Sequence, residues 1–429
     1  MAERDPIRID DYGRPGLPLP LRVLNRVAGP FARRLVSLDP AALLAAARKR
    51  TGLSDFGPDG FREPFELLLR AFENEAGLTP MGRVLTRQLM LQLLGTRLRM
   101  QDLVTRHPEI ERERIAAPIV IMGLPRTGTT HLHNLISQDP DLHSLAYWES
   151  LEPVPPAAVL ADPSAPDPRF GRCEQALKFL HYVMPLLPLM HEMTSESRHE
   201  EVQLLAVEFA TMLFEASYRV PSYRDWYQAT DQAPAYATLK RLLQILQWHR
   251  GGGGRWVLKS PQHLEQIGPL LATFPDAKIV QTHRDPVRVT ASFCTMGAYS
   301  LRMNAGAIDP IAVGRYWADR IEAMLRASID DRPRIPAEQI FDLRFHDFMA
   351  DDVAMVERIY AFAEQPLTPA AQRAMRDYMA ANPRGKHGTV AYSLEDFGID
   401  PDERRRALRF YQERFELPDD RAGGPGTAG

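Results

Sequence analysis

One short stretch of the chain combines the residue types that bind anions. Gly123–Thr130 reads Gly-Leu-Pro-Arg-Thr-Gly-Thr-Thr; the apolar run before it (119–122) predicts a strand, and the pattern after it (131–138) predicts a helix. A turn between a strand and a helix directs backbone N–H groups outward, and the helix N-terminus adds partial positive charge. Phosphate or sulfate oxygens fit such a turn, with Arg126 as the cation. The hydroxyl donors available there are Thr127, Thr129 and Thr130.

Two alternatives to this anion-binding turn, an ordinary tight turn and a nucleotide P-loop, explain fewer of its residues. An ordinary tight turn accounts for Gly123 and Gly128, but not for an arginine and three threonines within five residues. The P-loop of nucleoside-triphosphate enzymes has the same glycine spacing, but a lysine follows its second glycine and reaches the β- and γ-phosphates. Here Thr129 stands at that position, and the cation, Arg126, comes earlier. The pattern therefore disfavours a kinase or a GTPase.

A second motif lies downstream, where Arg284 follows a predicted strand at 278–282 and Ser292 comes eight residues later on a predicted helix. A helix that begins near Asp285 carries Ser292 two turns along, and Arg284 can fold back over the same face. A guanidinium and a hydroxyl together suit a dianionic phosphate. Arg284 alone could be a surface ion pair with Asp285. Two such motifs, each at a strand end, argue against coincidence.

The two motifs resemble those of sulfotransferases that use 3′-phosphoadenosine 5′-phosphosulfate (PAPS). The run 125–130 resembles the 5′-phosphosulfate-binding loop of that family, and Arg284 with Ser292 resembles its 3′-phosphate pair. The resemblance implies an enzyme that moves a sulfuryl group from PAPS to a hydroxyl or amine acceptor. The nucleotide-binding residues that it implies are Arg126, Thr127, Gly128, Thr129, Thr130, Arg284 and Ser292.

Further segments extend the resemblance to about residues 116–415, and it is strongest to the large bacterial branch of the superfamily (sulfotransferase family 3 proteins). The segment 256–263 resembles the strand whose lysine, here Lys259, faces the sulfate. The segment 341–348 resembles a structural strand of the family, with His346 in the place of a glutamate.

A basic segment at 384–388 resembles the C-terminal loop that closes over the nucleotide, which adds Arg384 and Lys386 to the expected ligands. The sequence departs from the family at His131. The family usually has a tryptophan there that stacks on adenine, so the adenine contact is left open.

Sulfuryl transfer needs a base for the proton of the acceptor and cations for the charge that grows on the leaving phosphate. We expect Arg126 and Lys259 to supply the cations. A ground-state phosphate ligand remains the alternative for Arg126, and a surface ion pair remains the alternative for Lys259. This chemistry requires no metal, and the sequence has no convincing cluster of metal ligands.

Three groups of residues are candidates for the base. Glu149 lies twenty-three residues after Arg126, similar to the catalytic glutamate of protein-tyrosine sulfotransferases, and it is the first choice. His263 is the second, near the position of the catalytic histidine in the cytosolic enzymes but two residues out of register. The cluster of His191-Glu192 with His199-Glu200-Glu201 is the third, because Glu200 or Glu201 could face the acceptor.

Strand and helix patterns that alternate from residue 116 predict an α/β fold. We expect a P-loop-like three-layer sandwich with a central, mostly parallel sheet. The predicted organisation is a helical N-terminal region packed on the core (1–115), a PAPS-binding domain (116–420) and a disordered tail (421–429). A helical insertion at about 150–250, with helices at 198–216 and 233–248, is a plausible substrate lid.

The overall composition excludes several classes. The chain has 429 residues, a net charge of −3 and two cysteines, which gives no reason to expect nucleic acid as a partner or a disulfide framework. No apolar run reaches the ~20 residues of a membrane span, and a cytoplasmic protein is expected. The stretch 19–38 sets apolar residues among arginines. It could lie on a membrane surface, but a helix packed on the domain with a solvated basic edge is favoured.

The acceptor and the oligomeric state are left open. A small molecule, a lipid or a carbohydrate would each suit the family. Two alternative functions remain, a P-loop-like nucleotide kinase and a non-catalytic nucleotide-binding protein of the same fold. The missing P-loop lysine disfavours the first, and the retained cations Arg126, Lys259 and Arg284 disfavour the second.

Overall fold

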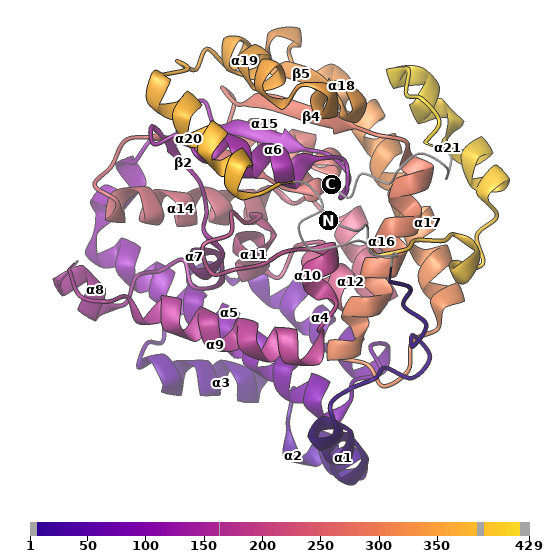
Figure 1. Ribbon diagram of the computed structural model, residues 1–429. Coiled ribbons are helices and arrows are strands. Elements are labelled where there is room, and N and C mark those ends of the chain that lie inside the picture. The colour runs from indigo at the N-terminus through magenta and orange to yellow at the C-terminus, as the bar shows by residue number, and fades with distance from the viewer. Residues whose placement is uncertain (1–6, 163, 384–389, 421–429) are drawn as a thin grey trace.

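A central parallel sheet organises the molecule (Figure 1). A computed structural model describes residues 7–162, 164–383 and 390–420. Within these ranges the sheet has five strands in the order β2-β3-β1-β4-β5, and each neighbouring pair is parallel. The strands are β1 (Ile119–Met122), β2 (Leu142–His143), β3 (Arg255–Lys259), β4 (Lys278–His283) and β5 (Ile340–Arg344). The predicted α/β fold with a mostly parallel sheet is confirmed.

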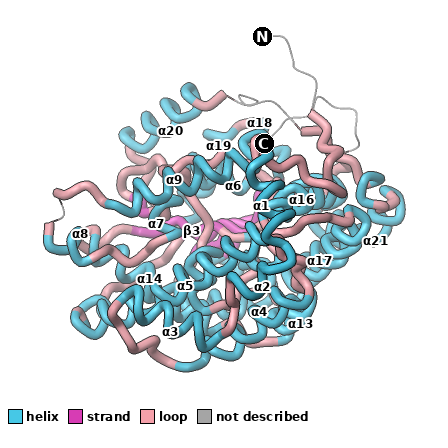
Figure 2. Tube along the Cα trace, turned by 90° about the horizontal axis from the view of Figure 1, so that it is seen from below, coloured by secondary structure: helices cyan, strands magenta, loops and turns pink. Residues whose placement is uncertain are grey.

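The strands divide their side chains between two hydrophobic cores. In β1, Ile119 and Ile121 belong to one core, whereas Val120 and Met122 belong to the other. Successive side chains of a strand point to opposite faces, and a run that is apolar throughout is expected where both faces are covered. Figure 2 shows the strands between helices on both sides. This is the predicted three-layer arrangement.

Each face of the sheet has its own set of helices. One core is completed by α6 (Thr129–Ile136), α19 (Asp352–Ala363) and α20 (Pro369–Ala381). The other includes residues of α14 (Ala233–His249), α15 (Ile267–Thr273), α16 (Pro286–Ser300) and α17 (Pro310–Asp330). The remaining helices after β1 are α7 (Tyr147–Leu151), α8 (Ala157–Ala161), α9 (Pro168–Val183), α10 (Leu187–Met190), α11 (Val202–Leu205), α12 (Leu213–Ser217), α13 (Pro221–Ala229), α18 (Phe345–Ala350) and α21 (Pro401–Phe415).

The N-terminal region is helical, as predicted. Its helices are α1 (Leu19–Ala28), α2 (Ala32–Leu35), α3 (Pro40–Thr51), α4 (Arg62–Asn74) and α5 (Pro80–Arg106). Asp39 and Thr79 cap the N-termini of α3 and α5 by accepting backbone N–H groups, and a proline follows each cap. Residues of α3, α4 and α5 are buried in the same core as α14 and α16.

The single helix predicted at 198–216 is wrong. The chain forms α11 and α12 there, separated by a turn in which Phe209 has a left-handed φ of 57°. Side chains from other elements satisfy the backbone of this break. The N–H of Thr211 donates to the Tyr223 hydroxyl and that of Met212 to Gln262 Oε1. Apolar spacing therefore indicated burial, while long-range polar contacts decided the backbone path.

No helix in the described ranges is long and apolar enough to cross a membrane. The predicted disordered tail at 421–429 lies outside the described residues.

Candidate active site

The anion-binding loop lies at the carboxyl end of β1, which is the central strand. Both Arg126 (φ 71°) and Gly128 (φ 88°) adopt left-handed backbone conformations, and α6 begins at Thr129. Gly123 lies so close to β4 that a Cβ atom there would meet Thr282 Oγ1 at 2.0 Å. The first glycine is therefore needed for close packing of two strand ends, and the second for the turn into the helix.

The threonines of the loop have different surroundings. The Thr127 hydroxyl is buried, lies 2.6 Å from the carbonyl of Leu124 and shares a hydrogen bond of 2.6 Å with the hydroxyl of Thr282. These contacts hold the loop against β4. Thr129 is buried at the start of α6, whereas Thr130 is exposed.

Arg126 connects the loop to α10, which lies between β2 and β3 in the sequence. Its guanidinium donates to the carbonyl of Met190, on α10, at 2.7 Å and lies 5.9 Å from the ring centre of Tyr392. The backbone carbonyl of Arg126 accepts a hydrogen bond of 2.9 Å from Arg284. The two motifs, far apart in the sequence, are therefore in direct contact.

Arg284 and Ser292, the predicted 3′-phosphate pair, lie after β4 and on α16. Arg284 follows β4 and stacks over the ring of Phe345 at 3.9 Å, and burial lowers the pKa of its guanidinium. The Ser292 hydroxyl, on α16, is buried and has no hydrogen-bond partner among the described residues. A buried hydroxyl without a partner is costly unless a ligand completes it. The Ser292 hydroxyl is therefore a polar group that the described residues leave without a partner.

Sequence reasoning missed the partner that Arg284 has in this structure. The carboxylate of Asp420 accepts from Arg284 Nε at 3.2 Å and lies 2.8 Å from His346 Nε2. The Asp420 carboxylate therefore pairs with Arg284, the residue predicted to bind the 3′-phosphate. No local pattern around Asp420 could have indicated this contact, because the residues are far apart in the sequence.

Lys259 ends β3 and forms a buried ion pair with Glu200. Its backbone N–H donates to both carboxylate oxygens of Glu201 at 2.9 Å. Burial raises the pKa of Glu200, but the Lys259 ammonium outweighs it, so the pKa lies below its usual value. Burial lowers the pKa of His199 to about 3. The pair is thus an ammonium and a carboxylate beside a neutral imidazole.

The first two candidates for the base do not lie in this ion pair. Glu149 accepts from the backbone N–H of Ala146 at 3.2 Å, at the start of α7, and from Arg250 at 2.6 Å. His263 is fully buried, and its Nδ1 lies 2.7 Å from the Tyr236 hydroxyl. The structure instead brings Glu200 to Lys259. The signal that could have ranked Glu200 higher is the His-Glu-Glu run in which it lies.

The remaining residues of the predicted nucleotide site pair with other side chains or lie outside the described ranges. His131 Nε2 lies 2.7 Å from a carboxylate oxygen of Asp352, and its ring is 5.3 Å from that of Phe348. Arg384 and Lys386 lie outside the described residues. Within the described ranges, no group of three or more histidine, cysteine or acidic side chains could hold a metal ion.

Comparison with known proteins gives one consistent result. The model of a family described as "Sulfotransferase family" matches residues 118–369, more than half of the chain. Two solved structures are similar over most of it. Sulfotransferase STF1 from Mycobacterium tuberculosis is 31% identical with a TM-score of 0.75, covering 86% of this chain and 98% of that one. Sulfotransferase STF9 from Mycobacterium avium is 28% identical with a TM-score of 0.78, covering 88% and 97%.

A curated relative is the omega-hydroxy-beta-dihydromenaquinone-9 sulfotransferase Stf3 of Mycobacterium bovis. The two sequences are 26% identical over an alignment of 255 residues. The alignment covers 57% of this chain and 61% of the length of that relative. The family match covers the sheet, the anion-binding loop and the strand ends that carry Lys259 and Arg284. The chain belongs to the sulfotransferase family.

Proposed function

We propose that this protein transfers a sulfuryl group from PAPS to an acceptor hydroxyl or amine. The observation that carries the proposal is that Arg126 and Arg284 follow β1 and β4 and that Lys259 ends β3. These are three adjacent strands of one parallel sheet. Ligands of open parallel sheets bind at the carboxyl ends of the strands, where the chain changes direction across the sheet.

Each part of the site has a role in this proposal. Arg284 and Ser292 bind the 3′-phosphate, and the loop from Gly123 to Thr130 binds the 5′-phosphosulfate through its backbone and the start of α6. PAPS supplies the activated sulfuryl group. Arg126 and Lys259 offset the negative charge that develops on the leaving phosphate.

We propose Glu200 as the base that takes the acceptor proton. Its carboxylate shares an ion pair with Lys259, which places a proton acceptor beside a cation that we assign to the leaving phosphate. Glu149 is less suited, because its carboxylate pairs with Arg250 and caps α7, rather than lying beside a cation that we assign to the leaving phosphate. His263 is less suited because its side chain is fully buried, with Nδ1 at the Tyr236 hydroxyl and Nε2 3.5 Å from Glu201. Their assigned roles are then structural, with Glu149 capping α7 and His263 buried behind β3.

The acceptor that we propose is a hydroxyl on a largely apolar molecule. Support comes from the name of the curated relative, which gives omega-hydroxy-beta-dihydromenaquinone-9 as its acceptor.

The test measures binding of three nucleotides: 3′-phosphoadenosine 5′-phosphate (PAP), adenosine 5′-phosphosulfate and ATP. The wild type should prefer PAP. Arg284→Ala and Ser292→Ala should each weaken PAP binding ten- to a hundredfold, because loss of a charge-assisted phosphate contact costs ~1.5–3 kcal/mol. They should leave adenosine 5′-phosphosulfate, which lacks the 3′-phosphate, little changed.

Transfer of radiolabelled sulfate from PAPS to a hydroxylated isoprenoid would complete the test. Preference for ATP would favour the kinase-like alternative. PAP binding without transfer to any of a broad acceptor set would favour a non-catalytic nucleotide-binding protein.

A further inference from the structure

The first two helices carry an exposed apolar ridge. Its members are the six large side chains Leu19, Val23, Leu24, Val27, Phe31 and Leu35, and they make up half of the exposed large hydrophobic side chains of the described residues. Val27 is 68% exposed and Leu35 71% exposed. A concentration of this kind on a water-soluble surface marks a site of interaction.

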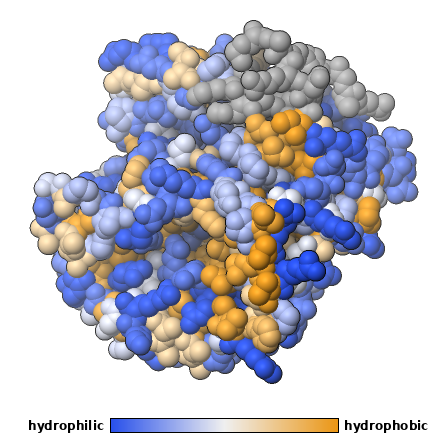
Figure 3. Space-filling model, turned by 60° about the horizontal axis from the view of Figure 1, so that its bottom comes forward, coloured by the Kyte–Doolittle hydropathy of each residue, from blue (hydrophilic) through white to orange (hydrophobic). Residues whose placement is uncertain are grey.

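Helical spacing explains why the apolar side chains share one side of α1. Leu19, Val23 and Val27 are four residues apart, so they lie above one another on the same face. Arg22 and Arg26 follow the same spacing along the edge of that face. Figure 3 brings forward the bottom of the view in Figure 1, where α1 lies; a hydrophobic strip bordered by strongly hydrophilic residues runs over this side.

The opposite side of the same segment is anchored to the body of the protein. Asn25 accepts the backbone N–H of Met81 at 3.0 Å, and Leu21 packs against the main core. α1 is therefore held by an inner face that includes Leu21 and Asn25. The exposed apolar side chains lie on the outer face, beside the exposed Arg22 and Arg26.

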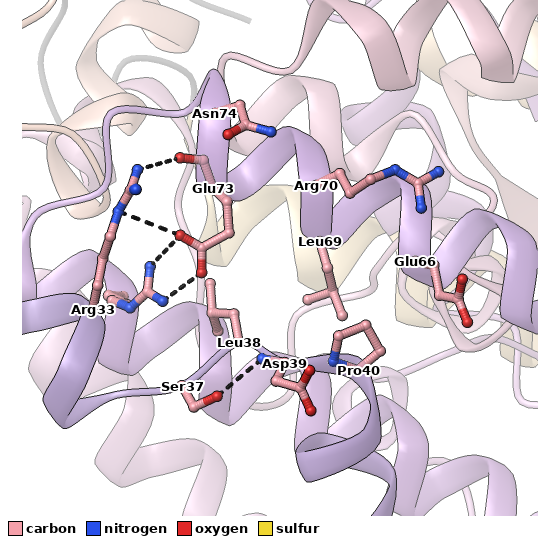
Figure 4. A pocket seen from close by; sticks show the side chains of 11 residues that line it. Arg33, Ser37, Leu38, Asp39, Pro40, Glu66, Leu69, Arg70, Glu73 and Asn74 are labelled. Atoms are coloured by element: carbon pink, nitrogen blue, oxygen red, sulfur yellow. Dashed lines mark hydrogen bonds and ion pairs between the residues drawn. The ribbon is translucent and has the colours of Figure 1, made fainter.

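An ion-pair network holds α2 in the same way (Figure 4). Arg33 donates to the backbone carbonyl of Glu73 at 2.8 Å, and the Glu73 carboxylate accepts from Arg83 at 2.8 Å. These residues line a depression of about 420 Å³ between α2, α3 and α4. The ridge is thus presented on a fixed support.

The charge of the segment selects among possible partners. Residues 19–38 contain four arginines and no aspartate or glutamate. Arg22, Arg26 and Arg34 are exposed and form no ion pair with any described residue. A second copy of the chain seated on the same ridge would bring arginines against arginines. A partner with an apolar interior and a negatively charged outer layer would bind both the apolar ridge and the arginines beside it.

We propose that α1 and α2 dock the protein on an anionic lipid surface. The apolar ridge would enter the boundary between headgroups and acyl chains, with the arginines at the level of the lipid phosphates. This inference does not depend on the proposed function, because docking needs neither nucleotide nor acceptor. It would place the protein where an apolar acceptor is concentrated.

The test is sedimentation of the full-length protein with vesicles, without nucleotide. The wild type should bind vesicles of phosphatidylglycerol and phosphatidylcholine and bind pure phosphatidylcholine far less. Val23→Glu with Val27→Glu should weaken binding at least about tenfold, because charged carboxylates replace buried apolar groups next to an anionic surface.

A matched control introduces the same charges elsewhere. Ile311→Glu with Val353→Glu changes two exposed apolar side chains outside the ridge and should leave vesicle binding unchanged. Arg22→Gln with Arg26→Gln should weaken binding to anionic vesicles by roughly ten- to thirtyfold, since each basic residue near such a surface contributes roughly fivefold. The circular dichroism spectrum and the urea unfolding midpoint of every variant should equal those of the wild type and show that each one is folded.

Three results would overturn the proposal. One is absence of vesicle binding by the wild type. Another is equal loss of binding in the ridge pair and the control pair. The third is a concentration-dependent dimer of the wild type that Val23→Glu with Val27→Glu dissociates, without vesicle binding, which would assign the ridge to a second copy of the chain.

Discussion

The ion pair of Lys259 and Glu200 brings an ammonium and a carboxylate together in a buried place beside the anion-binding loop. Neutral His199 lies next to it, so it adds no positive charge that would compete for the carboxylate. Because Lys259 can stabilise negative charge and Glu200 can accept a proton, the pair contains both functions that sulfuryl transfer requires.

Glu200→Gln should separate these two functions. Glutamine keeps the size of the side chain but cannot accept a proton near neutral pH. We expect kcat to fall by roughly 10²–10⁴-fold, with PAP affinity little altered, because a base acts on the acceptor and its contribution is made in the transition state.

Glu149→Gln and His263→Asn are the comparisons for this prediction, and steady-state kinetics with PAPS is the measurement. Both should lower kcat less than Glu200→Gln does. A larger effect of Glu149→Gln would return the role of base to Glu149, and a larger effect of His263→Asn would assign it to the histidine.

At the scale of the elements, the site depends on how closely β1 and β4 approach where they end. Gly123 follows β1 and Thr282 lies on β4, and the space between them leaves no room for a side chain. The hydrogen bond between the hydroxyls of Thr127 and Thr282 closes the same gap. One contact region therefore positions both the 5′ loop and the strand that leads to Arg284.

Gly123→Ala should disturb this contact and lower stability by about 2 kcal/mol, a typical cost of overpacking. Urea unfolding would measure the loss, and PAP binding should weaken as the loop shifts. Gly171→Ala is the matched control: Gly171 lies within α9, where a Cβ atom meets nothing within 4 Å. That change should stabilise the protein by about 0.5–1 kcal/mol. Equal stability of Gly123→Ala and the wild type would contradict the argument.

At the scale of the whole molecule, the C-terminal part of the chain returns to the carboxyl end of β4. Beyond α21, the backbone N–H of Asp420 donates to Asp285 at 2.9 Å, and the Asp420 side chain pairs with Arg284 and His346. The Asp420 carboxylate is thus bound to the guanidinium of Arg284, which we propose as a ligand of the 3′-phosphate. Binding of PAP must displace it.

Asp420→Asn should therefore tighten PAP binding by about three- to tenfold, because the amide competes weakly for a guanidinium. Affinity for adenosine 5′-phosphosulfate should not change. Asp419→Asn is the control, since Asp419 pairs with Arg405 at 2.5 Å rather than with Arg284. Isothermal titration calorimetry measures all three proteins. Weaker PAP binding in Asp420→Asn would show that Asp420 supports the site.

The buried histidines make the stability of the whole molecule sensitive to acid. Burial lowers the pKa of His133 and His199 in the folded protein, whereas in the unfolded chain both bind protons below about pH 6.5. Their contribution to stability is therefore complete above that pH and is lost as the pH falls. Each should lower the free energy of unfolding by about 1.4 kcal/mol per pH unit below 6.5.

Urea unfolding between pH 7 and pH 5 measures this dependence. His199→Gln should reduce the slope of the free energy of unfolding against pH by about 1.4 kcal/mol per pH unit, which is the contribution of one histidine. A slope that is the same in His199→Gln and the wild type would contradict the neutral state assigned to His199.

The local parts of the site were determined by the sequence itself. β1 and the start of the helix after β4 have the predicted positions, and Arg126, Arg284 and Ser292 lie at the expected strand ends and helix. These features depend on interactions between near neighbours: apolar runs form buried strands, glycines permit left-handed turns, and Asp285 caps the helix that carries Ser292.

The tertiary structure alone decided which charged groups meet. Glu200 reaches Lys259 across 59 positions of the sequence, and Asp420 reaches Arg284 across 136. The broken helix around Phe209 likewise depends on side chains from α13 and from the segment after β3. The energy of a charge pair depends on distance and burial in space. Residue type and spacing along the chain contain neither quantity, and so the sequence left the choice among Glu149, His263 and Glu200 open.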